Sequence, residues 1–551
     1  GTFAFDENGE PYDYNGDGLV ENLIADPQND TNGWFHGLGD RGDDSSRYGY
    51  RYKDLGSLAD FSQENQNVAA YLEQATLFWA DMGVNGIRHD ATLHMDAAFA
   101  KGLKDAVDSH NTITQFGEFF IGRPDPKYDE YVYFPKQTGI NNLDFEFYRA
   151  ASATFGDFST TMADFGNMLQ YTQDDYDYEN QAVTFLDNHD VTRFGYTQRS
   201  QKTYNAALAT LLTSRGVPNI YYGTEQYVVP ADGSDVSGRI FMQTDSSFDT
   251  DTTAYKLIGK LSELRQQNDA IAYGTTTIRY SNDDVLIYER KFYDDVILVA
   301  INRQPDKAYT IDNVETLLPE GEYVDFLGGM LNGENISVYA STGINTTASI
   351  TLDGGEVGIW QYDAAANAPE IGNVVSTMGR AGNRVYIYGD GLDGNISVKF
   401  GETEATVESN TANEIVTYVP DNAVAGYNDI TVTKGDAVSN SFTYNVLSGD
   451  QNQVIFHVKA ETSYGENFYI VGNVPELGSW NPDKCTEALL NPNYPEWFLP
   501  VSVPAGTEIQ FKFIKKDANG TVTWESGDNR VITSSSLSAG TVDTEVYTWR
   551  N

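Results

Sequence analysis

The sequence predicts a multidomain protein in which a parallel α/β unit precedes three all-β domains. Two patterns carry this prediction. Up to about residue 271, helical stretches such as VAAYLEQATLFWADMG alternate with short apolar runs such as NGIRHD, which is typical of βα units and a parallel sheet. After the last helical stretch, LIGKLSELRQQN, the segments read as β-strands as far as the C-terminus. At 551 residues the chain is also too long for a single core.

Composition and turn signals set the domain boundaries. Residues 1–65 are rich in Gly, Asp, Asn and Tyr and predict an irregular, loop-rich lobe. The stretch AAANAPEIGN is a linker, and LSGDQNQ opens the last domain. After the lobe we expect the α/β part at 66–271, an antiparallel β domain at 272–366, an immunoglobulin-like spacer at 367–447 and a final β domain at 448–551.

The charge balance narrows the possible partners. The chain has 80 acidic and 35 basic residues and a formal net charge of −45. Such a surface repels phosphate backbones and anionic lipids, which predicts no nucleic-acid partner, no membrane partner and a neutral substrate. The lone Cys485 excludes an intrachain disulfide and a cysteine metal cluster.

Charged residues follow three of the predicted strands. They are Arg88 and Asp90 in GIRHD, Glu118 in QFGE, and His189 and Asp190 in DNHD. Parallel α/β barrels place their active sites at this end of the strands. Carboxylates brought together there suit glycoside hydrolysis, in which one is ionised and one is protonated. In an acidic protein any one of them can be a solvated loop residue, but three at successive strand ends favour an active site.

These motifs resemble a known family. GIRHDATLHM, FGEFF and FLDNHDVTRF resemble three signature regions of the α-amylase family, glycoside hydrolase family 13. LTSRGVPNIYYGTEQY and the later domains narrow the resemblance to cyclodextrin glucanotransferases and maltogenic α-amylases. The resemblance implies a retaining reaction with Asp90 as nucleophile, Glu118 as general acid/base and Asp190 as transition-state stabiliser, supported by Arg88, Asn188 and His189.

The resemblance also implies an incomplete catalytic domain. The family has a (β/α)8 TIM-type barrel, and its first signature region does not occur in this sequence. The predicted strands then correspond to about strands 4–8, and residues 1–65 to the lobe inserted after the third strand. Because such a remnant leaves apolar strand edges unpaired, we expect a gene fragment or a barrel completed by another chain. A catalytically incomplete starch-binding fragment is the alternative from a different functional class.

A structural Ca²⁺ is a further expectation from the resemblance. In the family it ties the lobe to the barrel, and the matching positions are the Asp60 carboxylate and the backbone carbonyl of His94. Another ligand belongs to the missing first region.

The cleft motifs favour hydrolysis over cyclisation. Cyclising relatives carry an aromatic residue where KDLGSLAD has Gly56, and a lysine where this chain has Leu93, next to the substrate-binding candidate His94. Phe120 matches a retained acceptor-side aromatic, and Asp235 and Arg239 are the candidates for a donor-side pair. We therefore expect an amylase, with a maltose-forming amylase as one option and a cyclodextrin glucanotransferase as the alternative.

The last domain carries a sugar-binding pattern. Trp480 in LGSWNP and Trp524 in VTWESGDN flank β-hairpins, and glucose stacks its apolar face on such rings. A core role is the alternative for both rings. The domain resembles carbohydrate-binding module family 20, which implies a first starch site with Lys512, Glu525 and Asn529 as hydroxyl partners and a second site at Tyr494. Trp497 is expected to be structural. Together the features predict a secreted enzyme acting on starch and related α-1,4-glucans.

Overall fold

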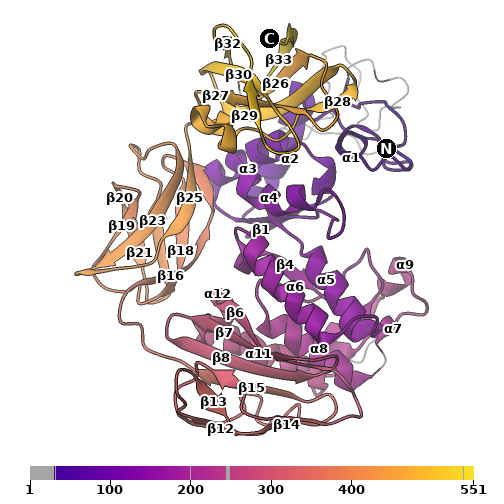
Figure 1. Ribbon diagram of the computed structural model, residues 1–551, viewed down its shortest axis with the longest axis vertical. Helices are drawn as coiled ribbons and strands as arrows, with labels where there is room; N and C mark the ends of the chain where they lie inside the picture. Colours follow the sequence, from indigo (N-terminus) through magenta and orange to yellow (C-terminus); the bar gives the residue numbers. More distant parts are fainter. Residues whose placement is uncertain (1–29, 31–32, 199, 243–247, 538) are drawn as a thin grey trace. The chain divides into compact units, whose positions relative to one another are not determined.

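The computed structural model describes residues 30, 33–198, 200–242, 248–537 and 539–551 (Figure 1). Most of the predicted 1–65 lobe before residue 33 lies outside this range. The chain divides into two compact units, which are described separately. The first unit contains the described residues up to Asn85, together with Ala91–Asn111 and Leu447–Asn551. The second contains Gly86–Asp90 and Thr112–Val446.

Parallel strands form the centre of the second unit. β1 (Gly86–His89) pairs with β2 (Thr114–Gly117), and β2 pairs with β3 (Asn141–Asn142). A parallel bridge from Leu143 to Val183 leads on to β4 (Val183–Phe185), which pairs with β5 (Val217–Asn219). These are the predicted strands, in the predicted parallel arrangement. Within the described residues β1 pairs only with β2 and β5 only with β4; that the barrel is incomplete stays a prediction.

Helices connect these strands, and local sequence signals set their starts. Thr161 and Asp164 cap α6 reciprocally, each side chain accepting from the other residue's backbone N–H. Asp144 caps α5 by accepting from the N–H of Phe147. The helices are α4 (Tyr128–Thr138), α5 (Phe145–Ala151), α6 (Met162–Asp175), α7 (Phe194–Thr197), α8 (Gln201–Thr213), α9 (Asp235–Gly238), α11 (Thr253–Gln267) and α12 (Asp269–Tyr273).

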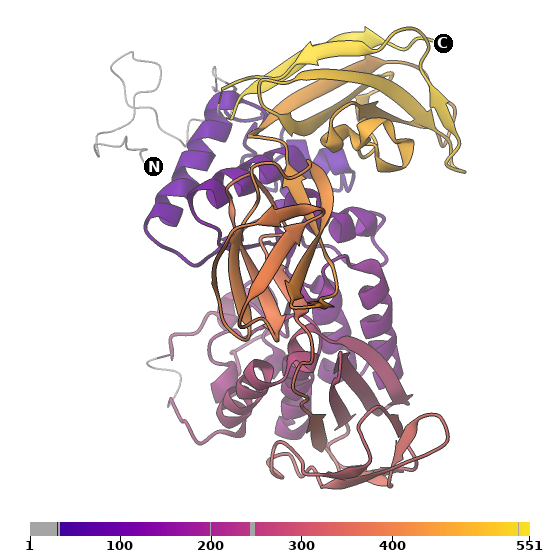
Figure 2. The same cartoon turned by 90° about the vertical axis from the view of Figure 1, so that its left-hand side faces the viewer.

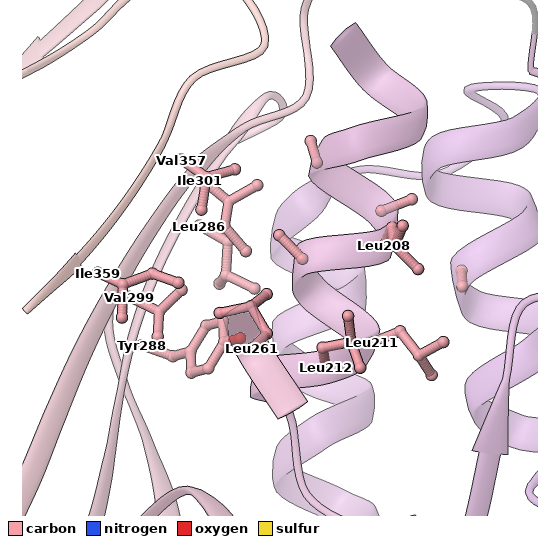
Figure 3. Packing of buried hydrophobic residues seen from close by; sticks show 14 of the residues in the cluster. Leu208, Leu211, Leu212, Leu261, Leu286, Tyr288, Val299, Ile301, Val357 and Ile359 are labelled. Carbon is pink, nitrogen blue, oxygen red and sulfur yellow. The ribbon is translucent and has the colours of Figure 1, made fainter. Parts of the chain in front are cut away.

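An antiparallel β domain follows α12 and packs on the helices. Its central sheet has the order β15-β8-β7-β6. Leu286 and Val299 of this sheet meet Leu261 of α11 in a shared apolar core that also includes α8 (Figure 3). The strands are β6 (Thr275–Ser281), β7 (Val285–Phe292), β8 (Asp295–Asn302), β9 (Tyr309–Ile311), β10 (Glu315–Thr316), β11 (Gly321–Tyr323), β12 (Ile336–Tyr339), β13 (Asn345–Thr347), β14 (Ile350–Leu352) and β15 (Val357–Tyr362).

A β-sandwich completes the second unit, drawn in orange in Figure 2. One sheet has the order β16-β18-β22-β21, the other contains β17-β25-β23-β19-β20, and a core around Val374, Val398 and Ile430 fills the space between them. The strands are β16 (Glu370–Val375), β17 (Met378–Arg380), β18 (Arg384–Asp390), β19 (Ile396–Phe400), β20 (Thr403–Ala405), β21 (Val407–Asn410), β22 (Glu414–Tyr418), β23 (Gly426–Lys434), β24 (Ala437–Val438) and β25 (Phe442–Leu447).

The first unit combines the lobe, two long helices and the C-terminal domain. The long helices are α2 (Gln66–Asp81) and α3 (Ala97–His110), and the lobe contains the short helix α1 (Arg47–Tyr52). Trp497 is 2% exposed and its indole N–H donates to the carbonyl of Ala460, so it is a core residue as expected.

Nowhere in the described chain does a helix combine the length and apolarity needed to cross a membrane. The strands of the C-terminal domain are β26 (Gln451–Lys459), β27 (Asn467–Gly472), β28 (Leu490–Asn493), β29 (Glu496–Pro504), β30 (Glu508–Lys516), β31 (Val522–Trp524), β32 (Arg530–Thr533) and β33 (Thr541–Thr548).

Candidate active site

Three carboxylates lie at the same edge of the parallel strands. Asp90 follows β1 directly, and Glu118 follows β2 directly, with its N–H donating to the carbonyl of His89 at 2.9 Å. Asp190 lies in the loop after β4. Because parallel strands end at a common edge, the sequence positions of these residues are enough to bring their side chains together.

Arg88 links the three carboxylates. Its guanidinium hydrogen-bonds Asp90, donates to Glu118 Oε2 at 2.9 Å and lies 3.9 Å from Asp190 Oδ2. The Asp90 side chain is 76% exposed, whereas that of Glu118 is 12% exposed. The two acids therefore have different environments: one faces solvent and the other is largely enclosed.

The environment of Glu118 favours its protonated form. Burial raises the pKa of the Glu118 carboxyl, and the charges of Asp190 and Asp90 raise it further, while Arg88 opposes them. A carboxyl that keeps its proton to a higher pH than usual can donate it to a leaving oxygen. Glycoside cleavage needs such a proton donor beside a second carboxyl group, and Arg88 holds Asp90 next to Glu118.

Asp190 is held by the residues that the sequence placed around it. Its N–H donates to Asn188 Oδ1 at 2.8 Å, and His189 Nε2 lies 2.9 Å from its Oδ2. Arg239 donates to Asp190 Oδ1 at 3.0 Å and to Asp235 Oδ2 at 3.1 Å. The structure thus joins the candidate Asp235–Arg239 pair directly to the carboxylate cluster.

Arg193 is a residue that the sequence reasoning missed. Its side chain is 1% exposed, stacks on the Tyr221 ring at 3.8 Å, and donates to the carbonyls of Tyr222 and Gly238. A Cβ at Gly238 would lie 3.0 Å from the Arg193 side chain, which shows how closely the two segments pack. Arg193 therefore fixes the Asp235–Arg239 segment against the Asp190 loop. Its place in the quoted FLDNHDVTRF motif was the available signal.

Two other cleft candidates are accessible. Phe120 is 44% exposed and contacts Phe145 with ring centroids 4.2 Å apart, so one part of its ring is supported and another faces solvent. Gly56, in the first unit, has φ +63° and no atom within 4 Å of where a Cβ would lie. Leu93 is 6% exposed and offers no polar contact.

The two predicted calcium ligands have protein partners. Asp60 Oδ2 lies 2.7 Å from His36 Nδ1, and the His94 carbonyl accepts from Gln63 Nε2 at 3.3 Å. Although burial lowers it, hydrogen bonds to Asp60 and Glu64 raise the pKa of His36 to about 9. No group of three or more acidic, His or Cys side chains in the described ranges is arranged to hold a metal. Calcium at Asp60 and the His94 carbonyl therefore stays a prediction.

The structure agrees with the two tryptophans of the first predicted starch site but not with Glu525. Trp524 is 41% exposed and Trp480 is half-buried, so neither ring is a core residue. Glu525 is 2% exposed and its carboxylate is taken up by Arg530 and the N–H of Phe513. Its predicted role as a hydroxyl partner is therefore wrong, because the pair with Arg530 holds it in the core.

The remaining predicted partners stay near the surface. Lys512 donates to the carbonyl of Gly527 at 2.6 Å, and the exposed Asn529 donates to Gln510 at 3.4 Å. Tyr494 is 51% exposed, and its hydroxyl accepts from the N–H of Thr462 at 2.9 Å. That loop also presents Tyr464, which is fully exposed and which the sequence reasoning missed.

Comparison with known proteins identifies each part of the chain. Residues 22–237 match the alpha amylase catalytic domain, 279–363 the alpha amylase C-terminal all-beta domain, 369–447 the IPT/TIG domain and 451–544 the starch binding domain. The fold and the cluster of carboxylates therefore define an enzyme of the α-amylase type that carries a starch-binding domain.

Relatives over nearly the whole chain narrow this class. A cyclomaltodextrin glucanotransferase of Thermoanaerobacterium thermosulfurigenes is 45% identical over 98% of this chain and 74% of its own length. One of Paenibacillus macerans is 43% identical over 100% of this chain and 75% of its own. The crystal structure of the γ-CGTase of alkalophilic Bacillus clarkii matches with a TM-score of 0.87 and 40% identity, over 95% of this chain and 77% of that one. The chain belongs to the cyclomaltodextrin glucanotransferase family.

Proposed function

We propose that this chain supplies the catalytic machinery of a cyclomaltodextrin glucanotransferase, which cleaves an α-1,4-glucosidic bond and transfers the new chain end to a sugar hydroxyl. The observation that carries the proposal is the Arg88-linked cluster, in which Glu118 has a raised pKa beside the exposed Asp90. Relatives of this name cover nearly the whole chain and support transfer better than the hydrolysis that the sequence favoured.

The geometry suits a double displacement. Glu118 gives its proton to the glycosidic oxygen while Asp90 attacks the anomeric carbon and forms a glycosyl ester. Glu118, now ionised, takes the proton of the incoming hydroxyl, which displaces Asp90 from the anomeric carbon. Arg88 hydrogen-bonds both Asp90 and Glu118, and two carboxyls held by one guanidinium suit the short separation of a retaining enzyme better than the wider gap of an inverting one. This favours retention.

Asp190 has a different proposed role. It follows a buried loop, and His189 and Arg239 both contact its carboxylate. These contacts fix its position, so that its negative charge can stabilise the positive charge that develops on the sugar ring. The exposed rings of the C-terminal domain would hold the enzyme on starch. Because starch is too large to enter a cell, we also propose that the enzyme is secreted.

Hydrolysis is the second candidate, and Gly56 favours it. A glycine leaves no ring around which a glucan could curl, and the space beside it is open. The Gly56→Tyr variant tests whether this glycine favours hydrolysis. Because the backbone at Gly56 has φ +63°, any side chain there destabilises the folded protein by about 1–2 kcal/mol. We expect this variant to raise the share of cyclic products, and an unchanged product ratio would remove Gly56 from the argument.

The first experiment is to identify the products from soluble starch by chromatography. Cyclic glucans would support transfer, and linear maltose and short oligosaccharides would support hydrolysis. Binding to starch granules with no products, in folded protein, would favour the starch-binding fragment instead. The Glu118→Gln variant is the control, because any product that it forms at the wild-type rate does not come from this site.

A further inference from the structure

A groove in the first unit separates the lobe from the C-terminal domain. It has a volume of about 340 Å³ and is lined by lobe residues such as Tyr48 and by residues of β26, β28, β29 and β33. This volume falls within the range of about 300–1,000 Å³ that is usual for small-ligand sites. The groove is not lined by Trp480, Tyr494 or Trp524.

Partly buried ion pairs join the two walls. Glu487 of the C-terminal domain pairs with Arg47 and, at 3.2 Å, with Arg51 of α1. Burial raises the pKa of the Glu487 carboxyl, but the charges of Arg47 and Arg51 outweigh it, and the pKa is lowered overall. Arg47 also donates to the carbonyl of Ala488 at 2.8 Å. The groove is therefore formed in advance rather than assembled around a ligand.

Aromatic rings form a continuous wall of this groove. Tyr48 stacks on Tyr52 with centroids 5.1 Å apart, and the Phe498 ring meets Tyr52 edge-on at 5.4 Å. Phe498 also stacks with His457, with ring centroids 5.9 Å apart. Tyr48 and Phe498 are half-buried, so each ring is supported and still reaches the groove. Flat supported rings are what the apolar face of a sugar packs against.

Carboxylates lie among these rings. Asp543 is 2.7 Å from His457 Nε2, Glu496 is 2.9 Å from Lys459, and both carboxylate side chains are at least half exposed. They have acceptor positions left for hydroxyl donors. Glu64 also lines the groove, where it pairs with His36 at 2.9 Å. The exposed Asp543 and Glu496 together with a net charge of −45 make the groove disfavour anions. Rings and acceptors without a cationic cluster select a neutral polyhydroxylated ligand.

We propose that this groove is a further α-1,4-glucan binding site, built jointly by the lobe and the starch-binding domain. It goes beyond the proposed function, because it is separate from the carboxylate cluster and its failure would leave the cleft chemistry unchanged. Tyr48 and Phe498 supply the stacking surface, and Asp543 and Glu496 accept from sugar hydroxyls.

The test is hydrogen–deuterium exchange of the whole chain with maltoheptaose as the probe. The Glu118→Gln change prevents turnover, and Trp480→Ala, Trp524→Ala, Tyr494→Ala and Tyr464→Ala remove the exposed rings of the starch-binding domain. In this background we expect maltoheptaose to protect peptides covering 38–52 and 490–500. Adding Asp543→Asn should weaken that protection about 3- to 10-fold in affinity, whereas Glu545→Gln, an exposed charge on the same strand outside the groove, should not.

Two results would overturn the proposal. One is no protection of either peptide in this background, and the other is protection that Asp543→Asn leaves unchanged, which would mean that it arises from sugar bound elsewhere. If the multiple variant does not fold, the same comparison of Asp543→Asn with Glu545→Gln is made in Glu118→Gln alone, counting maltoheptaose sites by calorimetry. A site count that Asp543→Asn does not reduce contradicts the groove.

Discussion

The carboxylate cluster and the starch-binding domain recognise the same kind of polymer in contrasting ways. In the cluster, each acid follows a parallel strand and one guanidinium contacts all of them. In the domain, rings such as Trp524 and Tyr494 stand on separate surface segments, and each is exposed by itself. The chemistry is concentrated and partly buried, whereas the binding is dispersed and open to water.

The contrast shows what each task requires. Shifting the pKa of Glu118 needs burial and nearby charges, so its position is coupled to its neighbours. Stacking on a sugar needs only an accessible ring, so its position is less constrained. A change in the cluster should therefore have a larger effect than a change in the domain.

The largest expected effect is that of Glu118→Gln. Loss of the proton donor should lower the rate of starch cleavage by about 10²–10⁴-fold. Binding to starch granules should stay the same, since the exposed rings are not changed. Steady-state rates and a granule pull-down measure the two quantities. A rate within tenfold of the wild type would contradict the role of Glu118.

Arg193→Gln should have the next largest effect. Loss of the guanidinium removes the stacking on Tyr221 and the hydrogen bond to the Gly238 carbonyl, so the segment that carries Arg239 is no longer held in place. Because small displacements at a reacting centre are costly, kcat should fall about 10²-fold with little change in KM. Arg193→Lys, which keeps the charge but not the planar fork, should recover only part of the loss. A lower melting temperature with unchanged kcat would mean that Arg193 is structural only.

Arg88→Met should move the pH–rate profile. The positive charge of Arg88 lowers the pKa of Glu118, so removing it raises that pKa further. The acid then keeps its proton to higher pH, and the alkaline limb should move up by about one to three pH units. Rates measured from pH 5 to pH 10 test this. An alkaline limb that stays in place or moves down would show that Arg88 does not control Glu118.

Trp524→Ala should have the smallest effect. Losing one stacking ring costs about 1 kcal/mol, or roughly fivefold in granule affinity, and should leave activity on soluble starch unchanged.

Glu525→Gln provides the contrast inside the same domain. It weakens the buried pair with Arg530, so it should lower the melting temperature of the domain. A Glu525→Gln protein of unchanged stability that binds starch less well would restore its predicted role.

Prediction from sequence worked best where neighbours in the chain decide the structure. The alternation of helices and short apolar runs located the parallel strands, and a strand end places Asp90 or Glu118 without further information. It worked less well where distant residues decide. Glu525 follows the exposed Trp524 directly, and its place in the chain therefore suggested that it faces the sugar as well. In the structure its carboxylate is buried, because it accepts hydrogen bonds from Arg530 and from the N–H of Phe513.

The sequence by itself determined the order of the domains, the identity of the three acids and the family to which they point. It did so because strand period, strand ends and motif spacing are local properties. Only the tertiary structure decided that Arg88 contacts all three carboxylates, that Arg193 joins two loops and that a groove lies between the lobe and the starch-binding domain. These depend on burial and on side chains far apart in the chain, and no local pattern records which of them meet.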